Sequence, residues 1–445
     1  MLKYFKNRHN YYAVIIVILS SATASLLLGE TLNLDAPELW SIHYQATVIP
    51  QMHGYFNSPY SGTNSLSPNP EVQTSFTTTL FLGRRLWKGG EFYFNPELAA
   101  GEGLSGSVGL AGAANGETYR IGSTAPAGNI SRLYFKQVFE MGGAKETIMP
   151  DKNQLGDEVC KNRLTLVLGK FSLSDFFDGN SYSHDPRTQF INWAIMDNGA
   201  WDFAADTRGY TWGAMLDYNR ERWAARLASV LEPKVANQLY LDLNIPQAHS
   251  ENAEFEYRYS AGSHPGKITV LGYANHAHMG NYRDSLNLSP VNPDIIQTET
   301  YCLKYGFGID YEQEITKDLG CFLRAGWNDG ATESWAFTEI DRTVSGGISL
   351  NGSSWNRPDD TFGLAFDING LSADHRDYLE AGGYGFLIGD GKMNYAPEEI
   401  LETYYLWKIV QRFSITGDFQ LVNNPAYNQD RGPVSVFAMR LHYEI

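Results

Sequence analysis

The stretch SHDPRTQFINWAIMDNGAWDFAADTRGYTWG, residues 183–213, holds the side chains of this sequence that are best suited to chemistry. It contains one His, four Asp, two Arg and three Trp, in a chain of which only 19% of the residues are charged. Ser183, His184 and Asp185 are the residue types of a hydrolytic triad. Neighbours in an extended chain point to opposite sides, however, so adjacency does not bring a nucleophile to its base. The stretch predicts a polar functional site, and a hydrolase is the less favoured interpretation of it.

Two turn-forming triplets, Asp-Asn-Gly at 197–199 and Asn-Asp-Gly at 328–330, resemble pieces of calcium-binding loops. Neither continues with the alternating acids and final Glu of an EF-hand, and both dipeptides are good turn formers in any protein. Residues 177–186 offer no His/Cys spacing for zinc. We therefore expect no cofactor and no metal among the site residues, and leave open a structural Ca²⁺ ion bridging acidic loops.

The first residues of the chain indicate its compartment. Three cationic residues among the first eight precede an apolar run that ends in Ala-Thr-Ala at 22–24, the pattern of a secretory signal peptide over 1–24. The apolar run is too short to span a bilayer. We expect the mature chain to start near Ser25, with an N-terminal periplasmic segment over 25–40 before the first strand.

Charge and composition exclude several classes of protein. Loss of the three cationic leader residues takes the net charge from −16 to −19, so we expect no binding to nucleic acid. The three cysteines, Cys160, Cys302 and Cys321, are an odd number and predict structural singletons. The 43 Gly, 27 Tyr and 23 Phe, with a mean hydropathy of −0.32, favour many strands joined by turns over a helical enzyme.

Long alternating segments are the strongest structural signal. In 434–445, Phe, Met, Leu, Tyr and Ile occupy one face while Ala, Arg, His and Glu occupy the other. Segments 301–312, 400–409 and 412–421 alternate in the same way. Runs of ten to twelve residues suit a tilted crossing of a bilayer, with an apolar face toward lipid and a polar face toward a water-filled lumen. Only a closed barrel satisfies every backbone group of such strands in lipid.

Strands of this kind recur from Trp40 to the end of the chain. Their even number places both termini in the periplasm. Short connections alternate with long polar ones, except that 142–162 and 369–382 are longer than periplasmic turns should be, and the second is expected to hold a short helix capped by Ser372. The expected strands lie near 41–52, 73–86, 90–97, 130–141, 163–173, 208–218, 222–231, 252–260, 266–274, 300–313, 319–327, 360–368, 383–389, 398–409, 412–421 and 433–445. The predicted fold is an all-β, transmembrane, antiparallel barrel of 16 strands over 41–445.

On this map, residues 174–207 form the third external connection. A barrel of sixteen strands encloses a channel too wide to select among small solutes, so selectivity requires a segment folded inward and charges facing it. The Asp, Asn and Arg side chains of this loop suit sugar hydroxyls, and its Trp rings suit the apolar faces of pyranoses. We expect 174–207 to be the constriction loop. By alternation, the charged residues expected to point inward are Arg85, Glu91, Arg132, Lys136, Arg226, Lys304, Asp310, Arg324, Asp418 and Arg440.

The sequence resembles the carbohydrate-selective outer-membrane porin family (OprB-type). The stretches that carry the resemblance run in order along the mature chain and are SPYSGTNSL (58–66), LWKGGEFYFNPE (86–97), YSHDPRTQFINWA (182–194), GAWDFAADTRGYTWGA (199–214), RAGWNDGATESWAFTEID (324–341), YLEAGGYGFLIGDG (378–391) and NPAYNQDRGPV (424–434). The resemblance implies an integral bacterial outer-membrane barrel that passes mono- and oligosaccharides by diffusion. It also implies a homotrimer, contact with outer-membrane lipid and lipopolysaccharide, and a constriction of arginines and acids at an inward-folded loop. Such barrels commonly end in Phe or Trp, whereas this chain ends in Ile445.

Together, the loop and the inward-facing strand residues give one set of candidate constriction residues. We expect the solute to meet Arg85, Glu91, Arg132, Asp175, Asp178, His184, Asp185, Arg187, Trp193, Asp202, Asp206 and Arg208. Three alternatives stay open: a general diffusion porin without sugar selectivity, an outer-membrane barrel hydrolase, and a soluble sugar-binding β-protein.

Overall fold

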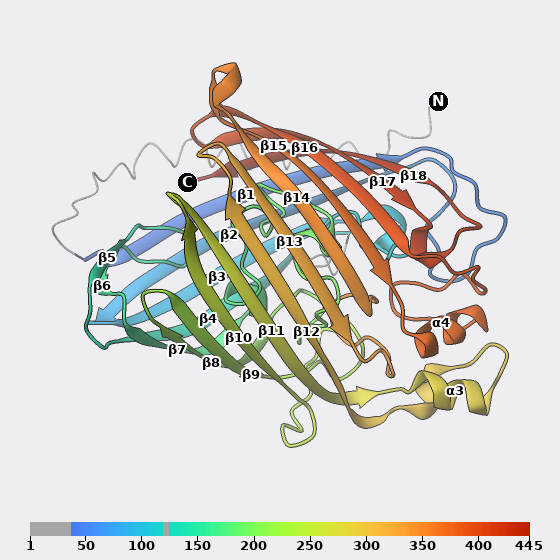
Figure 1. The fold of residues 1–445 in the computed structure, drawn as a ribbon. Coiled ribbons are helices and arrows are strands. Elements are labelled where there is room, and N and C mark those ends of the chain that lie inside the picture. The colour runs from blue at the N-terminus through green and yellow to red at the C-terminus, as the bar shows by residue number, and fades with distance from the viewer. Residues whose placement is uncertain (1–36, 119–123) are drawn as a thin grey trace.

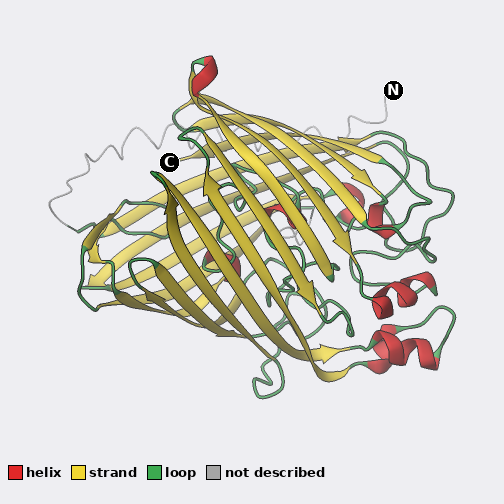
Figure 2. Cartoon of the chain, in the orientation of Figure 1, coloured by secondary structure: helices red, strands yellow, loops and turns green. Residues whose placement is uncertain are grey.

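The computed structural model of the chain describes residues 37–118 and 124–445, and these residues form one closed antiparallel barrel of sixteen strands (Figure 1, Figure 2). The first strand, β1 (Trp40–His53), pairs with β2 on one side and closes the barrel against β18 on the other. The remaining wall strands are β2 (Glu71–Trp87), β3 (Gly90–Gly101), β4 (Ala127–Glu140), β7 (Arg163–Phe171), β8 (Thr211–Asn219), β9 (Trp223–Val230), β10 (His249–Ala261), β11 (His264–Met279), β12 (Thr300–Glu314), β13 (Leu319–Asn328), β14 (Arg342–Gly352), β15 (Arg357–Gly370), β16 (Glu398–Val410), β17 (Phe413–Asn423) and β18 (Val434–Glu444). The predicted fold class and strand number are confirmed.

The predicted signal peptide, 1–24, and most of the segment 25–40 lie outside the described residues. No helix within 37–118 or 124–445 has both the length and the apolar character needed to cross a membrane.

The alternating apolar and polar residues of the sequence lie on the outer and the inner face of the wall, respectively. In β12, Tyr305, Phe307 and Ile309 are exposed on the outside, whereas Lys304 and Asp310 are buried in the interior. An apolar outer face and a polar inner face are what a barrel in lipid requires. Each strand pairs on both sides, so the wall has no open edge.

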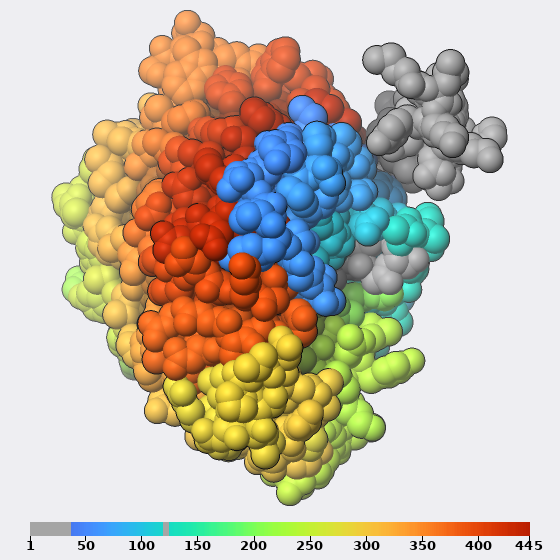
Figure 3. All heavy atoms as spheres, turned by 90° about the vertical axis from the view of Figure 1, so that its right-hand side faces the viewer, coloured from blue at the N-terminus to red at the C-terminus, as the bar shows by residue number. Residues whose placement is uncertain are grey.

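The two ends of the barrel differ in their connections. The last residue, Ile445, exchanges backbone hydrogen bonds with Tyr44 of β1, so both ends of the wall lie at the same rim, the periplasmic one. The short turns lie at this rim and the long loops at the other. The loop end is largely covered by segments near 54–70, 280–300 and 371–397, blue, yellow and orange-red in Figure 3.

One predicted strand is wrong and one strand was missed. Residues 383–389 belong to the long loop 371–397, where the backbone N–H groups of Leu387 and Ile388 donate to Glu339. The missed strand is β14, the twelfth strand of the wall in chain order, in a segment that was expected to be an external loop. Its glycines hide the alternation: Gly347 faces inward against the ring of Phe322, where a Cβ would stand 2.7 Å from a ring carbon.

This correction moves two connections to opposite ends of the barrel. Residues 353–356 join β14 to β15 as a periplasmic turn, and 369–382 lies at the loop end. The length of 369–382 is therefore no exception. The predicted helix is present as α4 (Ala373–Glu380), whose Ser372 hydroxyl accepts a hydrogen bond from the His375 N–H at 3.1 Å.

The other long exception, 142–162, is a true periplasmic insertion. It contains a small hairpin of β5 (Lys145–Ile148) and β6 (Asp157–Cys160), at the left of Figure 1. The hairpin folds back on the barrel, where Asp157 pairs with Arg85 at 2.8 Å and Lys152 pairs with Glu444 at 3.0 Å. The insertion thus covers part of the periplasmic opening.

The corrected topology predicts which residues are reached from outside the cell. In a variant with all three cysteines replaced by Ser, Glu380→Cys should react with a membrane-impermeant maleimide on intact cells, because α4 lies at the loop end. Ser354→Cys should react only after the outer membrane is permeabilised. The reverse pattern would contradict this topology and support the prediction from the sequence, which placed 369–382 at the periplasmic end.

Candidate constriction site

The third long loop, 172–210, enters the barrel and is buried against the inner wall. Its short helix α2 (Trp193–Met196) is buried at every residue, and the Asn192 side chain caps it by accepting a hydrogen bond from Ala194 N–H at 3.0 Å. Loop 3 is used below for residues 172–210. A loop enclosed by the wall must find partners for its backbone groups inside the barrel.

Carboxylates of the wall accept the backbone N–H groups of the loops. Glu402 accepts Ile191 N–H at 2.6 Å and Asn192 N–H at 3.1 Å. Glu398 lies four residues nearer the loop end on the same strand. It accepts the N–H groups of three residues, Ala111 at 3.0 Å, Gly112 at 2.7 Å and Ala426 at 2.8 Å. The two side chains thus give five buried loop amides a partner on the wall.

Arginines of the wall donate to the backbone carbonyls of the same loop. Arg324, whose side chain is 0% exposed, donates to the carbonyls of Ile195, Asp178 and Ser183 at 2.7–3.0 Å. Arg440 donates to the carbonyls of Pro186 and Gln189, both at 2.7 Å. Arg324 and Arg440 were expected as inward-facing charges, and they are inward-facing. Their donors are directed at loop 3.

Four of the candidate loop residues hold the loop in place. Asp178 accepts Asn198 N–H at 2.7 Å, and burial raises the pKa of Asp178 to about 6 despite the nearby Arg324 guanidinium. Asp202 accepts three successive N–H groups, at 335–337. Trp193 stacks on Phe337 with ring centroids 5.3 Å apart. Asp206 accepts Arg208 N–H at 2.9 Å and lies 3.4 Å from Lys170 at the end of the loop.

Six of the candidates meet at one cavity, which we call the loop cavity. It has a volume of about 570 Å³ and lies between loop 3, the wall at β2–β4 and β7–β8, and the periplasmic insertion. Its lining also includes the aromatic rings of Phe81, Tyr134 and Phe176. The candidates that line the loop cavity are Glu91, Arg132, Asp175, His184, Asp185 and Arg187.

The charges of the loop cavity are arranged in opposite pairs. Arg132 binds Asp175 through two of its nitrogens, with Nε 2.7 Å from Oδ2. Glu91 lies 3.0 Å from Lys136 and accepts the Tyr93 hydroxyl at 2.7 Å. The cavity therefore presents hydrogen-bond donors and acceptors of both signs next to aromatic faces.

Loop 3 contributes two further titratable residues, Asp185 and His184, to the lining of the loop cavity. Burial opposes ionisation of Asp185, but the charges of Lys152 and Arg187 outweigh it and hold the pKa of Asp185 below its usual value. Burial opposes protonation of His184 as well, yet the Asp197 carboxylate, 3.3 Å away, raises the pKa of the imidazole. Asp185 is thus a fixed negative charge at this point.

The periplasmic insertion contributes residues that sequence reasoning missed. Residues 151–155 line the loop cavity together with Asp185 of loop 3. Arg85, a candidate for the constriction, instead binds this insertion, with donations to Gly156 O at 3.2 Å and to Asp157 at 2.8 Å. The sequence marked 142–162 as too long for a turn, and this length was the available signal for a segment that folds back.

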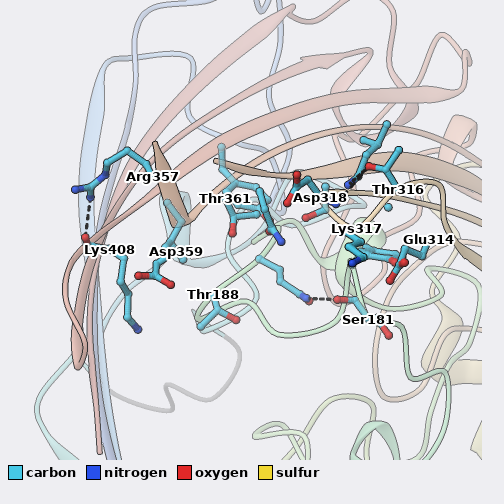
Figure 4. A pocket seen from close by; sticks show the side chains of 18 of the residues that line it. Ser181, Thr188, Glu314, Thr316, Lys317, Asp318, Arg357, Asp359, Thr361 and Lys408 are labelled. Carbon is cyan, nitrogen blue, oxygen red and sulfur yellow. Dashed lines mark hydrogen bonds between the residues drawn. The ribbon is translucent and has the colours of Figure 1, made fainter. Parts of the chain in front are cut away.

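A second cavity, of about 900 Å³, opens at the periplasmic rim and is called the mouth cavity (Figure 4). Loop 3 contributes Ser181, Tyr182, Thr188 and Gln189 to it. The wall and its turns contribute charged side chains that surround the opening, and these are Glu314, Lys317, Asp318, Arg357, Asp359 and Lys408. A smaller space of about 460 Å³ shares Thr188 with the mouth cavity and Asp185 with the loop cavity. No motif in the sequence marked these turn residues as functional.

The geometry does not build a hydrolytic triad at Ser183. The Ser183 hydroxyl donates to the carbonyl of Ile195 at 2.6 Å and is fully buried. His184 faces Asp197 and not Ser183. The hydroxyl is therefore engaged in holding the loop.

Comparison with known proteins identifies the barrel. A family model described as the carbohydrate-selective porin, OprB family, matches residues 63–444. The chain belongs to the OprB family. OprB of Pseudomonas putida in its high-pH structure is similar in fold at 15% sequence identity, with a TM-score of 0.70 over 92% of this chain and 94% of that one. The outer-membrane channel DcaP of Acinetobacter baumannii is similar at 8% identity, with a TM-score of 0.51 over 91% and 97%.

No curated protein matches the sequence. Family membership and the closed barrel together make this OprB-family protein an integral outer-membrane porin and a diffusion channel for carbohydrates.

Anchoring of loop 3 in the porin predicts a large effect at Arg324. Arg324→Ala should lower the free energy of unfolding by about 3–5 kcal/mol, because it leaves buried carbonyls and carboxylates without their partner. Thermal unfolding in detergent measures this change. Arg376→Ala, on the outside of α4, is the control and should unfold like the wild type. Equal unfolding temperatures for all three proteins would contradict the anchoring role.

Proposed function

We propose that the chain passes mono- and small oligosaccharides by passive diffusion, with the loop cavity as the selective constriction, and that it catalyses no reaction. The observation that carries this proposal is the combination of paired charges and aromatic rings around one space of about 570 Å³. Arginine and carboxylate groups make several hydrogen bonds to neighbouring hydroxyls, and rings pack on the apolar faces of sugars. A cavity of this volume is in the range that holds small ligands.

The site residues take two roles in this proposal. Glu91, Arg132, Asp175, Asp185 and Arg187 contact the solute, whereas Asp178, Trp193, Asp202 and Asp206 fix the loop that carries them. Arg187 is itself positioned by Glu117 at 3.1 Å and by Glu97 at 3.6 Å. Arg85 positions the periplasmic insertion, and Arg208 lies outside the lining of the loop cavity.

The remaining assignments also stay proposals. We infer removal of residues 1–24 on secretion, assembly as a homotrimer, and contact with outer-membrane lipid and lipopolysaccharide, in line with the resemblance of the sequence. A structural Ca²⁺ ion at the acidic loops stays a prediction. N-terminal sequencing and the mass of the detergent-solubilised complex test the first two inferences.

Sugar selectivity can be separated from general diffusion by liposome swelling. We expect glucose and glucose disaccharides to enter faster than amino acids and anions of similar size, because the lining offers hydrogen bonds to uncharged hydroxyls. Equal rates would leave a general diffusion porin. A protein-dependent, His184-dependent release of product from glycan or lipid substrates would instead support a hydrolase.

The loop cavity makes a specific prediction for Arg132. A hydrogen bond to a charged group contributes about 1.5–3 kcal/mol, which is tenfold or more in affinity. Arg132→Gln should therefore raise, by about tenfold, the disaccharide concentration that half-blocks the single-channel ion current. Arg84→Gln, on the outer face of β2, is the matched control and should leave this concentration unchanged. An unchanged value in Arg132→Gln would place sugar recognition elsewhere.

A further inference from the structure

Three metal-ligating side chains meet on the outer face of the wall, far from the lumen. His249 and Glu251 lie two residues apart on β10 and therefore share a face, and His276 of β11 is the cross-strand partner of His249. One ligand atom from each of the three side chains lies within 4.8 Å of those of the other two. A search of residues 37–118 and 124–445 for three or more His, Cys, Asp or Glu side chains close enough to share one metal ion finds this group.

The distances suit a small tetrahedral ion. The Nε2 atom of His249 is 3.4 Å from Oε1 of Glu251. Nitrogen and oxygen ligands lie about 2.0–2.2 Å from Zn²⁺, so two ligands of one tetrahedral ion stand about 3.4 Å apart. The rings of His249 and His276 stack with centroids 4.6 Å apart and an interplanar angle of 22°. Binding of one ion by both imidazoles therefore requires the His276 ring to turn out of this stack, so that its lone pair points at the ion.

His249 already has the outer hydrogen bond that metal-binding histidines use. Its Nδ1 lies 2.8 Å from the carbonyl oxygen of Ile245. A carbonyl only accepts, so Nδ1 carries a proton and Nε2 is the nitrogen that faces Glu251 and is placed to bind an ion. This arrangement fixes both the tautomer and the orientation of a ligating imidazole.

The cluster lies near the loop-side rim of the outer face, where an ion in the external water can reach it. Toward the periplasm, the outer face of the same two strands is apolar, with Phe255 on β10 and Val270 on β11 exposed to lipid. A polar trio that includes a carboxylate is costly in the middle of a bilayer and much less so at its edge. The cluster lies at the loop end of β10, where loop 231–248 enters the strand. His249 and His276 are half-buried, and Glu251 is exposed.

We propose that His249, Glu251 and His276 bind a divalent transition-metal ion, and that Zn²⁺ is the ion which this set of two imidazoles and one carboxylate suits. Three protein ligands leave a fourth position for water. The ion joins β10 to β11 at the loop-side rim. The site is independent of sugar passage, because its side chains point away from the lumen.

Zinc titration of the porin, folded in detergent and stripped with a chelator, tests the proposal. In competition with a chromogenic chelator, we expect one Zn²⁺ per chain. His249→Ala and His276→Ala should each weaken binding by more than about 100-fold, the upper limit for loss of an outer hydrogen-bond partner. The control is His264→Ala, since His264 pairs with Glu314 at 2.8 Å at the other rim and has no second imidazole in that pair.

A second measurement does not depend on affinity. The electron paramagnetic resonance spectrum of the Cu²⁺-loaded wild type should show coupling to two nitrogens, and each of the two ligand variants should lose one of them. Zn²⁺ should also raise the unfolding temperature of the wild type and of His264→Ala, but not of His276→Ala. Absence of Zn²⁺ binding in the wild type, or equal binding in the wild type and His276→Ala, would overturn the proposal.

Discussion

A backbone group that is buried inside the closed barrel needs a hydrogen-bond partner there, because the wall strands pair with each other on both sides. Loop 3 meets this requirement with carboxyl and guanidinium side chains of the wall. Glu402 accepts two of its N–H groups, and Arg324 and Arg440 bind its carbonyls. An uncompensated buried charge or amide costs several kcal/mol, so these charges and the loop require each other. The inward fold of the loop follows from this exchange.

The same exchange decides what the lumen offers to a solute. Charges that bind loop backbone, such as Arg324, are no longer available to sugar, whereas Glu91 and Arg132 remain at the edge of the loop cavity. The loop therefore selects which of the wall charges line the path. The periplasmic insertion narrows the solute path on its periplasmic side. There Lys152 lies near Asp185, and the two charges stabilise each other.

Much of the wall could be predicted because a strand in lipid must alternate, as β12 and β18 do. The alternation fails in β14, because Gly346 and Gly347 lack the side chains that would show it. Residues 383–389 resemble a strand because Leu387 and Ile388 are buried. The helix capped by Ser372 was recognisable from its first residues. In the site, inward direction was predictable for Glu91 and Arg132 from their strands. The density of Asp and Trp in loop 3 was a weaker guide, because Asp202 and Trp193 serve the packing of the loop, and nothing in 142–162 told which way it folds.

Hydrogen–deuterium exchange of loop 3 tests most directly the claim that carboxyl and guanidinium side chains of the wall hold it in the lumen. Peptides covering 190–196, which contain the amides bound to Glu402, should exchange as slowly as peptides from β16, and Glu402→Ala should make them exchange faster while Glu399→Ala, on the outer face of the same strand, should not. Exchange of these amides in the wild type at the rate of the exposed loop 231–248 would contradict the account.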